Sequence, residues 1–220
     1  MLAPLAQGMH FHTYSYLYPP RPENKIAKPQ LAFYENRGWW AQKKKNGTCT
    51  VIFARGNEII FKTRHNSDHK LWTPQGDHNA FFAGRPKWNV YVAELLHSKV
   101  SGGPKNELYI FDQIVKDGVQ LVGTTFAERQ EMLFDEFSGN DEGDQIRIAD
   151  RITLAKCFDE GFIEMYDHLK PEDEGLVLKN PEGKLSPCFK MDSNSNWQVK
   201  CRISHKNYSF LFAFFINSLI

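Results

Sequence analysis

The hydrophobic and polar positions of the chain form short runs, and from about residue 38 onward most of these runs have strand character. Runs rich in β-branched and aromatic residues, bounded by Gly, Pro, Asn or Asp, are typical of strands. They predict strands at 38–44, 48–54, 58–63, 89–96, 107–115, 119–123, 175–179, 185–190 and 197–203. Turns are predicted at 55–57, at 117–118 and at 180–183.

Two segments carry apolar residues at helical spacing instead. The segment 125–138 begins with the capping box Thr125-x-x-Glu128, and Phe126, Leu133 and Phe137 share one face. The segment 152–168 places apolar side chains four residues apart, at Leu154, Phe158, Phe162 and Tyr166. Long strands with helices inserted late in the chain predict an α+β domain of antiparallel β-sheets flanked by helices.

The two ends of the chain have a different character. Residues 1 to about 37 are rich in Pro, Tyr and His and predict an irregular N-terminal segment, and their start lacks the pattern of a secretory signal. The apolar run from Phe210 to Ile220 is shorter than the roughly 20 residues that a membrane-spanning helix needs. We therefore expect a packed terminal element or an exposed apolar tail, and no membrane partner.

The overall composition is that of an ordinary soluble globular protein, with 220 residues, 41% hydrophobic and 24% charged. Because 27 Lys and Arg residues face 26 Asp and Glu residues, a nucleic acid would have to be bound by a local basic face. The four cysteines are scattered without a C-x-x-C motif, which favours reduced thiols in the cytoplasm over a zinc site or disulfides.

Two other polar segments are expected to be loops. His65 and His69 are four residues apart, but no helical pattern surrounds them, so we predict loop residues and no zinc site. The acidic stretch from Asp135 to Asp144 lacks the ligand spacing of a calcium-binding loop and is expected to be solvated.

Three consecutive lysines, Lys43 to Lys45, precede Asn46-Gly47 and an apolar strand. Asn-Gly is a strong hairpin signal because both residues tolerate a positive φ, so a hairpin is predicted here. Neighbouring side chains of an extended strand point in opposite directions. We therefore expect Lys43 and Lys45 to point away from Lys44, toward solvent or nucleic acid.

Five further short motifs follow the lysines in order. They are Thr63-Arg64, Ala93-Glu94-Leu95-Leu96, Leu108-Tyr109-Ile110-Phe111-Asp112, Glu174-Gly175-Leu176-Val177-Leu178-Lys179 and Trp197-Gln198-Val199-Lys200-Cys201-Arg202. With Lys44-Lys45-Asn46-Gly47 as the first motif, the set resembles the nucleotidyltransferase motifs of ATP-dependent DNA and RNA ligases and mRNA capping enzymes, over residues 38 to 203. A Glu-Gly turn before a strand is common by itself, whereas this order is specific.

The resemblance implies an ATP-grasp-like nucleotidyltransferase (adenylation) domain in which Lys44 is the nucleophile. Its amine would attack the α-phosphorus of ATP and form a covalent lysyl-AMP, for which it must be unprotonated. Lys200, Arg202 and a bound Mg²⁺ or Mn²⁺ would favour the uncharged amine and neutralise the phosphates.

The resemblance also implies roles for the other motif residues. Gln42, on the same strand face as Lys44, would contact the adenine amino group, and Phe111 would stack on adenine, with Tyr109 as the alternative. Glu94 would accept a hydrogen bond from a ribose hydroxyl, and Arg64 would reach AMP or the phosphate of the broken strand.

Glu174 would be a metal or substrate ligand and take part in catalysis. Lys200 and Arg202 would bind the α-phosphate and the leaving pyrophosphate. Lys179 and Lys190 are further candidates for the same basic cleft.

The sequence departs from the DNA-ligase pattern at two positions. Asn46 replaces the usual acid of the first motif, and Cys49 stands where those ligases have a basic residue. Both changes lean toward RNA-ligase branches. Few residues follow Arg202, so we expect an irregular segment at 1–37, the catalytic domain at 38–203 and a short tail at 204–220, without an oligonucleotide-binding barrel.

The function that these observations predict is an ATP-dependent polynucleotide ligase that acts on nicked or broken DNA or RNA, with a slight lean to RNA. We expect a monomer, and a compact ligase of this kind suits a virus or phage. The alternatives are a GTP-dependent mRNA capping guanylyltransferase and an inactive relative that binds nucleotide or nucleic acid.

Overall fold

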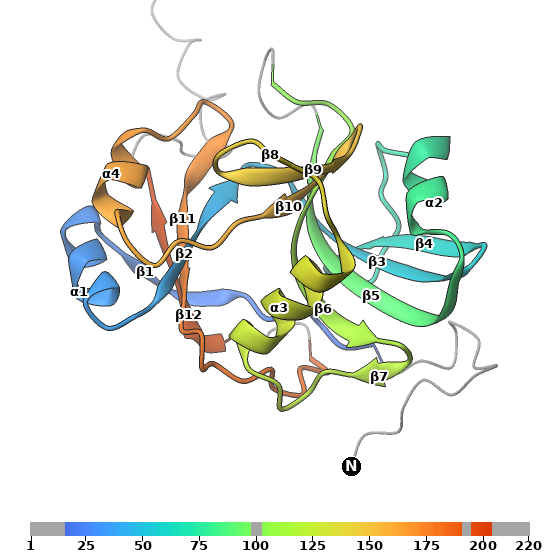
Figure 1. Cartoon of the computed structure of the whole chain (residues 1–220), viewed down its shortest axis with the longest axis horizontal. Helices are drawn as coiled ribbons and strands as arrows, with labels where there is room; N and C mark the ends of the chain where they lie inside the picture. The colour runs from blue at the N-terminus through green and yellow to red at the C-terminus, as the bar shows by residue number, and fades with distance from the viewer. Residues whose placement is uncertain (1–15, 98–102, 191–194, 204–220) are drawn as a thin grey trace, which may run out of the picture.

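The computed structural model describes residues 16–97, 103–190 and 195–203, which form two β-sheets with helices packed beside them (Figure 1). The apolar run from Phe210 to Ile220 lies outside the described residues. Within the described part of the chain, no helix has the length and apolar character needed to cross a membrane.

The smaller sheet has four strands in the order β1-β12-β11-β2. Its strands are β1 (Pro22–Ile26), β2 (Trp40–Lys45), β11 (Asp173–Lys179) and β12 (Ser195–Arg202). β1 is parallel to β12, and the other two pairings are antiparallel. A 3-10 turn, η2 (Lys28–Gln30), precedes α1 (Leu31–Glu35), and the latter lies beside α4 (Phe162–Asp167) at this end of the molecule (Figure 1).

The larger sheet has the order β4-β3-β5-β6-β10-β9-β8, with β7 paired to β6. Its strands are β3 (Thr48–Gly56), β4 (Glu58–Thr63), β5 (Arg85–Leu96), β6 (Glu107–Lys116), β7 (Val119–Gln120), β8 (Asn140–Asp141), β9 (Gln145–Ala149) and β10 (Ile152–Ala155). β10 is parallel to β6, and α2 (Gly76–Phe82) and α3 (Phe126–Glu136) supply side chains to the packing around the sheet. The α+β class with sheets and flanking helices is confirmed.

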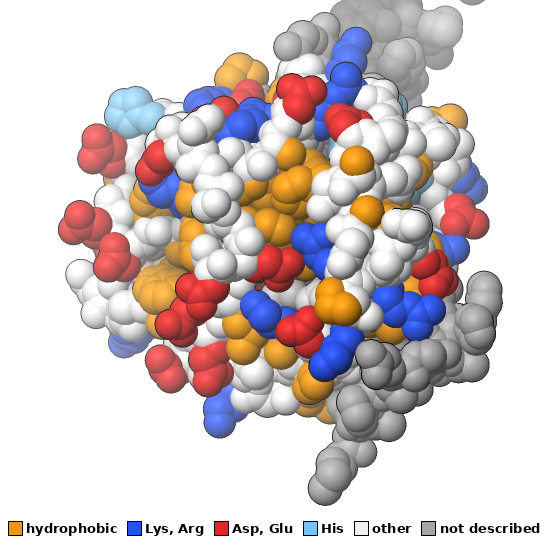
Figure 2. Space-filling view, turned by 45° about the vertical axis from the view of Figure 1, so that its right-hand side comes forward, with side chains coloured by type: hydrophobic (Ala, Val, Ile, Leu, Met, Phe, Trp, Pro, Cys, Tyr) orange, Lys and Arg blue, Asp and Glu red, His pale blue; other side chains and the backbone are white. Residues whose placement is uncertain are grey.

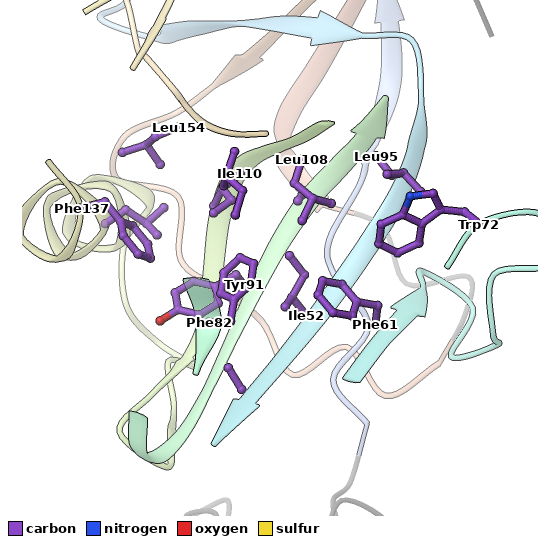
Figure 3. Packing of buried hydrophobic residues seen from close by; sticks show 14 residues of the cluster. Ile52, Phe61, Trp72, Phe82, Tyr91, Leu95, Leu108, Ile110, Phe137 and Leu154 are labelled. Atoms are coloured by element: carbon purple, nitrogen blue, oxygen red, sulfur yellow. The ribbon is translucent and has the colours of Figure 1, made fainter. Parts of the chain in front are cut away.

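Both faces of the larger sheet are buried. Along β3, Ile52 and Ala54 belong to one apolar cluster, whereas Val51 and Phe53 belong to another, because successive strand residues point to opposite faces. Figure 3 shows the first cluster, in which Tyr91 of β5 lies among side chains from several elements. These two clusters make the central strands a rigid support for the residues at their ends.

The segment Asn46-Gly47 does not form the predicted hairpin. β2 pairs with β11 in the smaller sheet and β3 pairs with β4 and β5 in the larger one, so Asn46-Gly47 carries the chain from one sheet to the other. Neither residue takes a positive φ. The glycine is required by close packing instead, since a Cβ at Gly47 would lie 2.7 Å from Cγ of Glu94 and would collide with the carbonyl oxygen of Leu95.

The predicted helix at 152–168 is also wrong. Residues Ile152–Ala155 form β10, which is buried on both faces, and the helix α4 covers Phe162–Asp167. The apolar side chains at spacings of four belong to different cores, because Leu154 packs in the larger sheet and Phe162 packs against the smaller one. Gly161, with φ of +74°, separates the two elements.

Three other elements test the sequence predictions. The helix that begins with the capping box is confirmed as α3, and Thr125 Oγ1 accepts from the Glu128 amide at 3.2 Å. The predicted strand at 185–190 is wrong, because Pro187 has no N–H to donate and the segment is irregular. Residues 22–35, predicted to be irregular, form β1 and α1. The division into domains remains a prediction.

Candidate active site

A cavity of about 250 Å³ lies between the two sheets, at the point where β2 leaves one sheet for the other. The walls come from β2, β11 and β12 on one side and from β3, β5 and β6 on the other. The predicted site residues that line it are Gln42, Lys44, Arg64, Glu94, Phe111, Lys200 and Arg202. Motifs that are far apart in sequence therefore meet in one place.

Strand register explains why Lys44 faces this cavity. Gly175 of β11 is opposite Lys44 on one side and opposite Arg202 on the other. Residues directly opposite one another in antiparallel strands share a face, so these two cations project on the same side with no side chain between them. A Cβ at Gly175 would collide with the carbonyl oxygen of Cys201, and its φ of +144° also favours glycine.

Glu174 does not line the cavity but forms an ion pair with Lys44, which does. The same carboxylate oxygen lies 3.5 Å from Nε of Arg202. Both the carboxylate and the amine are largely buried. The structure therefore places an acid in contact with the predicted nucleophile and beside one of the predicted phosphate-binding cations.

Lys200 lies in the same basic group. Its Nζ donates a hydrogen bond to the carbonyl oxygen of Pro22 at 3.1 Å. Burial lowers the pKa of Lys200, and the nearby charges of Arg202, Arg21 and Lys44 lower it further. A group of cations that disfavour one another's charge is suited to binding a polyanion.

Gln130 of α3 does not line the cavity but forms hydrogen bonds to two residues that do, Gln42 and Phe111. Nε2 of Gln42 donates to Oε1 of Gln130 at 3.1 Å and to Sγ of Cys157 at 3.3 Å. Nε2 of Gln130 donates in turn to the carbonyl oxygen of Phe111 at 3.1 Å. These bonds use the amide nitrogen of Gln42 and leave its carbonyl oxygen as an acceptor. Gln130 was missed in the sequence, where it belongs to no motif.

Lys179 is a buried cation in the cavity wall. Its Nζ has no hydrogen-bond partner in the described part of the chain, and it lies 5.1 Å from the ring centroid of Phe111 and 4.3 Å from that of Phe126. Burial lowers the pKa of Lys179 to about 8, which the charge of Asp112 partly offsets. Asp112 is itself held by Arg129, whose Nε lies 2.8 Å from Oδ1.

The wall formed by β3 and β5 is less charged than the opposite one. Cys49 faces Glu94 across the two strands, and burial followed by that carboxylate raises the pKa of the thiol to about 12. Arg64 donates from Nε to the carbonyl oxygen of Pro19 at 3.1 Å, and burial lowers its pKa. Cys49 is therefore a neutral group at this position of the cavity.

Lys43 and Lys45 do not face solvent, so the expectation of solvent-facing charge is wrong; both are buried and are among the residues that line the cavity. Nζ of Lys43 lies 2.9 Å from Asp144, and Nζ of Lys45 lies 2.8 Å from Asp173. All four side chains are at least nine-tenths buried. The acidic stretch from Asp135 to Asp144 was expected to be solvated, and this is wrong at Asp144, whose carboxylate is buried against Lys43. Buried charges require partners, and these lysines and carboxylates partner one another. This cluster fixes the backbone on both sides of Lys44.

Of the remaining predicted residues, only Tyr109 lines the cavity, whereas Lys190, His65 and His69 do not. Tyr109 lines the cavity with Phe111, two residues further along the same strand, and burial raises the pKa of Tyr109 well above its usual value. Lys190 is exposed and does not line the cavity. His65 and His69 lie in a loop, and among the described residues no three His, Cys, Asp or Glu side chains gather as a metal-binding group.

The cavity gathers cations, although the chain as a whole is close to neutral. On the face shown in Figure 2, acidic and basic side chains are interspersed around exposed apolar groups. With a formal net charge of +1, the chain has no general attraction for phosphates. Any such attraction has to arise locally, where the cavity gathers lysines and arginines.

The fold is similar to that of known DNA ligase domains. A mycobacterial DNA ligase D, in a structure with ATP and MES, matches with a TM-score of 0.57 and 18% identity over 86% of this chain and 61% of that one. The ligase domain of LigD from M. tuberculosis matches at 0.58, with 17% identity over 86% and 60%. A third structure, Pmar-Lig_Pre, matches at 0.59, with 14% identity over 85% and 46%.

At 14–18% identity, these structural matches show a shared fold. The chain spans about three fifths of the two mycobacterial ligase chains and less than half of the third. No protein-family model matches the chain, and no curated protein matches it in sequence.

Proposed function

We propose that this chain is an ATP-dependent polynucleotide ligase that works through a lysyl-AMP intermediate on Lys44. One observation carries the proposal: the amine of Lys44 faces a cavity that also contains Lys200 and Arg202, and it is in contact with the carboxylate of Glu174. The fold shared with ligase domains, one of them determined with ATP, supports the same conclusion.

In the first step, Nζ of Lys44 attacks the α-phosphorus of ATP, a P–N bond forms, and the bond to pyrophosphate breaks. Attack requires a lone pair, so the ammonium group of Lys44 has to lose one proton to solvent before the P–N bond forms. Lys200 and Arg202 balance the charge that develops on the phosphates. Stabilisation of developing charge by fixed cations and dipoles is usually the largest single contribution to the rate of an enzymatic reaction.

In the second step, a 5′-phosphate oxygen of the polynucleotide attacks the same phosphorus, the P–N bond breaks, and AMP passes to the strand. A 3′-hydroxyl then attacks the activated 5′-phosphate, which closes the backbone and releases AMP. Glu174 would hold Mg²⁺ or Mn²⁺ together with phosphate oxygens, since Mg²⁺ is usually bound through one or two carboxylates and its substrate. The ion would neutralise phosphate charge.

The base is held between Phe111 and the hydrogen-bonded pair of Gln42 and Gln130. Adenine carries an amino group that donates, and the carbonyl oxygen of Gln42 is the acceptor that remains available. Glu94 lines the cavity and would accept a hydrogen bond from a sugar hydroxyl. The strand that is sealed is DNA or RNA, with a slight lean to RNA because Asn46 and the neutral thiol of Cys49 both depart from the DNA-ligase motifs.

The experiment is covalent labelling with α-³²P-ATP or α-³²P-GTP, followed by denaturing electrophoresis. Wild-type protein is expected to retain label from ATP, and Lys44→Met is expected to retain none. Lys190→Met is the matched control, because Lys190 is exposed and outside the cavity. Sealing is then compared on nicked duplexes with each combination of DNA and RNA strands.

Each outcome separates the candidates. Label from GTP and not from ATP would indicate a capping guanylyltransferase, and no label from either nucleotide would indicate a binding protein without catalysis. Retention of label by Lys44→Met at the wild-type level would refute the nucleophile. Far-ultraviolet circular dichroism of the variant checks that the fold is intact.

A further inference from the structure

Residues 16–22 form a strap that crosses the cavity from one sheet to the other. At its start, Leu17 is fully buried in a core of the larger sheet, and the amide of Tyr18 donates to the carbonyl oxygen of Cys188 at 2.7 Å. At its end, Pro22 begins β1, which pairs with β12 of the smaller sheet. The last three residues of the strap line the cavity.

Two cations of the active site hold this strap. Arg64 donates to the carbonyl oxygen of Pro19, and Lys200 donates to that of Pro22, each at 3.1 Å. Arg21 is located between these two anchored carbonyl groups. The structure therefore couples the position of Arg21 to Lys200, which the proposed mechanism assigns to phosphate, and to Arg64, which by resemblance to ligases would reach AMP or the phosphate of the broken strand.

The local sequence makes the strap stiff around Arg21. The ring of a proline fixes its own φ and restricts the preceding residue to extended conformations. Pro19, Pro20 and Pro22 surround Arg21, so little backbone freedom remains to be lost when a ligand binds. A cation that is held in place in this way binds more tightly than one on a mobile loop.

The charge of Arg21 acts on the same cations. It contributes to the lowered pKa values of Arg64 and Lys200, after the larger effect of burial. Like charges that are brought together in this way favour an anion among them, and the planar guanidinium group matches two oxygens of a phosphate. Arg21 is also exposed, so it lies on the solvent side of the cavity.

We propose that Arg21 is a further phosphate-binding residue of this site, which binds a phosphate group at the mouth of the cavity. The identity of that phosphate rests on the proposed function. It is either the β- and γ-phosphates of ATP, which leave as pyrophosphate, or the 5′-phosphate of the strand, which enters afterwards. Arg21 belongs to none of the sequence motifs, although the run Pro19-Pro20-Arg21-Pro22 is a sign of a rigidly held cation.

The test compares Arg21→Ala and Arg21→Lys with the control Arg37→Ala. Arg37 is exposed, lies outside the cavity and stacks on Phe33, so its removal changes the net charge equally. Binding of inorganic pyrophosphate is measured by isothermal titration calorimetry. Formation of lysyl-AMP from ATP, and transfer of AMP from the preformed adduct to a 5′-phosphorylated nicked duplex, are measured separately.

Loss of one charge-assisted hydrogen bond predicts about a tenfold weaker affinity or slower step in Arg21→Ala. Arg21→Lys is expected to be less impaired than Arg21→Ala, because lysine keeps the positive charge but cannot bind two phosphate oxygens at once as the planar guanidinium group does. Weaker pyrophosphate binding and slower adduct formation identify ATP as the source, whereas a slower transfer step alone identifies the strand. The proposal is wrong if Arg21→Ala equals Arg37→Ala in all three measurements.

The result for Arg21 and the result for the proposed function are separable. If the wild-type protein forms no adduct, but Arg21→Ala binds pyrophosphate more weakly than the wild-type protein does, the phosphate site stands and the ligase function does not. If wild-type protein forms the adduct and Arg21→Ala behaves as the control throughout, the ligase function stands and the role of Arg21 does not.

Discussion

Lys179 gives the sharpest prediction about stability, because the protein buries its charge without a hydrogen-bond partner among the described residues. Replacing Lys179 with Met removes the charge and keeps an unbranched side chain beside Phe111 and Phe126. The pKa of Lys179 falls from 10.5 to about 8 on folding. At about 1.4 kcal/mol per unit, Lys179→Met should raise the free energy of unfolding by roughly 3 kcal/mol near neutral pH.

The gain should depend on pH in a defined direction. Below about pH 8 the lysine is charged in both the folded and the unfolded chain, and the folded state bears the full penalty of burying it. Between about pH 8 and 10.5 the unfolded chain binds more protons than the folded one, so the stability of the wild-type protein rises with pH. The advantage of Lys179→Met should therefore shrink across this interval.

Urea unfolding followed by circular dichroism, at several pH values from about 7 to 10, measures both effects. Lys190→Met is the control: this lysine is exposed, so the change should lie within about 0.5 kcal/mol at every pH. A Lys179→Met protein that is less stable than wild type at neutral pH, or a gain that is constant with pH, would show that burying the charge of Lys179 does not destabilise the folded state.

Three further substitutions test other parts of the structure, each by urea unfolding. Arg129→Ala leaves the buried carboxylate of Asp112 without its partner and should lower the free energy of unfolding by about 3–5 kcal/mol; a loss under about 1 kcal/mol would contradict this. Gly47→Ala forces a methyl group onto the backbone of Leu95 and should cost about 1–3 kcal/mol and reduce adduct formation, so an unchanged protein would show that the link relaxes freely. Thr125→Ala removes the cap of α3 and should cost about 1 kcal/mol, whereas Thr125→Ser should be close to wild type; equal losses in both would argue against the cap.

The sequence was most informative where local patterns and tertiary structure agree. The capping box at Thr125 starts α3, and the strands β3, β4 and β6 lie where β-branched and aromatic runs predicted them. The order of the motifs predicted that Lys44, Lys200 and Arg202 belong to one site, and all three line the same cavity. Strand register places Lys44 and Arg202 on one face of the smaller sheet.

The errors arise where distant segments decide local structure. The Asn46-Gly47 pair has the composition of a hairpin turn, but β2 and β3 do not pair with each other. β2 pairs with β11 in one sheet, and β3 pairs with β5 in the other. The spacing of Leu154 and Phe162 resembled a helix, although the two side chains serve different cores. Neither competition can be read from a window of neighbouring residues.

Partners of buried groups were invisible for the same reason. Lys43 and Lys45 were expected at the surface because charged side chains usually are, and the carboxylates that permit their burial come from distant parts of the chain. Gln130 and Arg21 belong to no motif, and their roles depend on which elements the fold places beside them.

In the proposed mechanism, the amine of Lys44 forms a covalent bond with the α-phosphate of ATP. Intact-protein mass spectrometry after incubation with ATP and Mg²⁺, followed by peptide mapping, measures this directly. The prediction is the addition of a single AMP on Lys44. Addition of AMP to Lys43, Lys45 or Lys179 instead, or no addition to a folded protein that binds ATP, would contradict it.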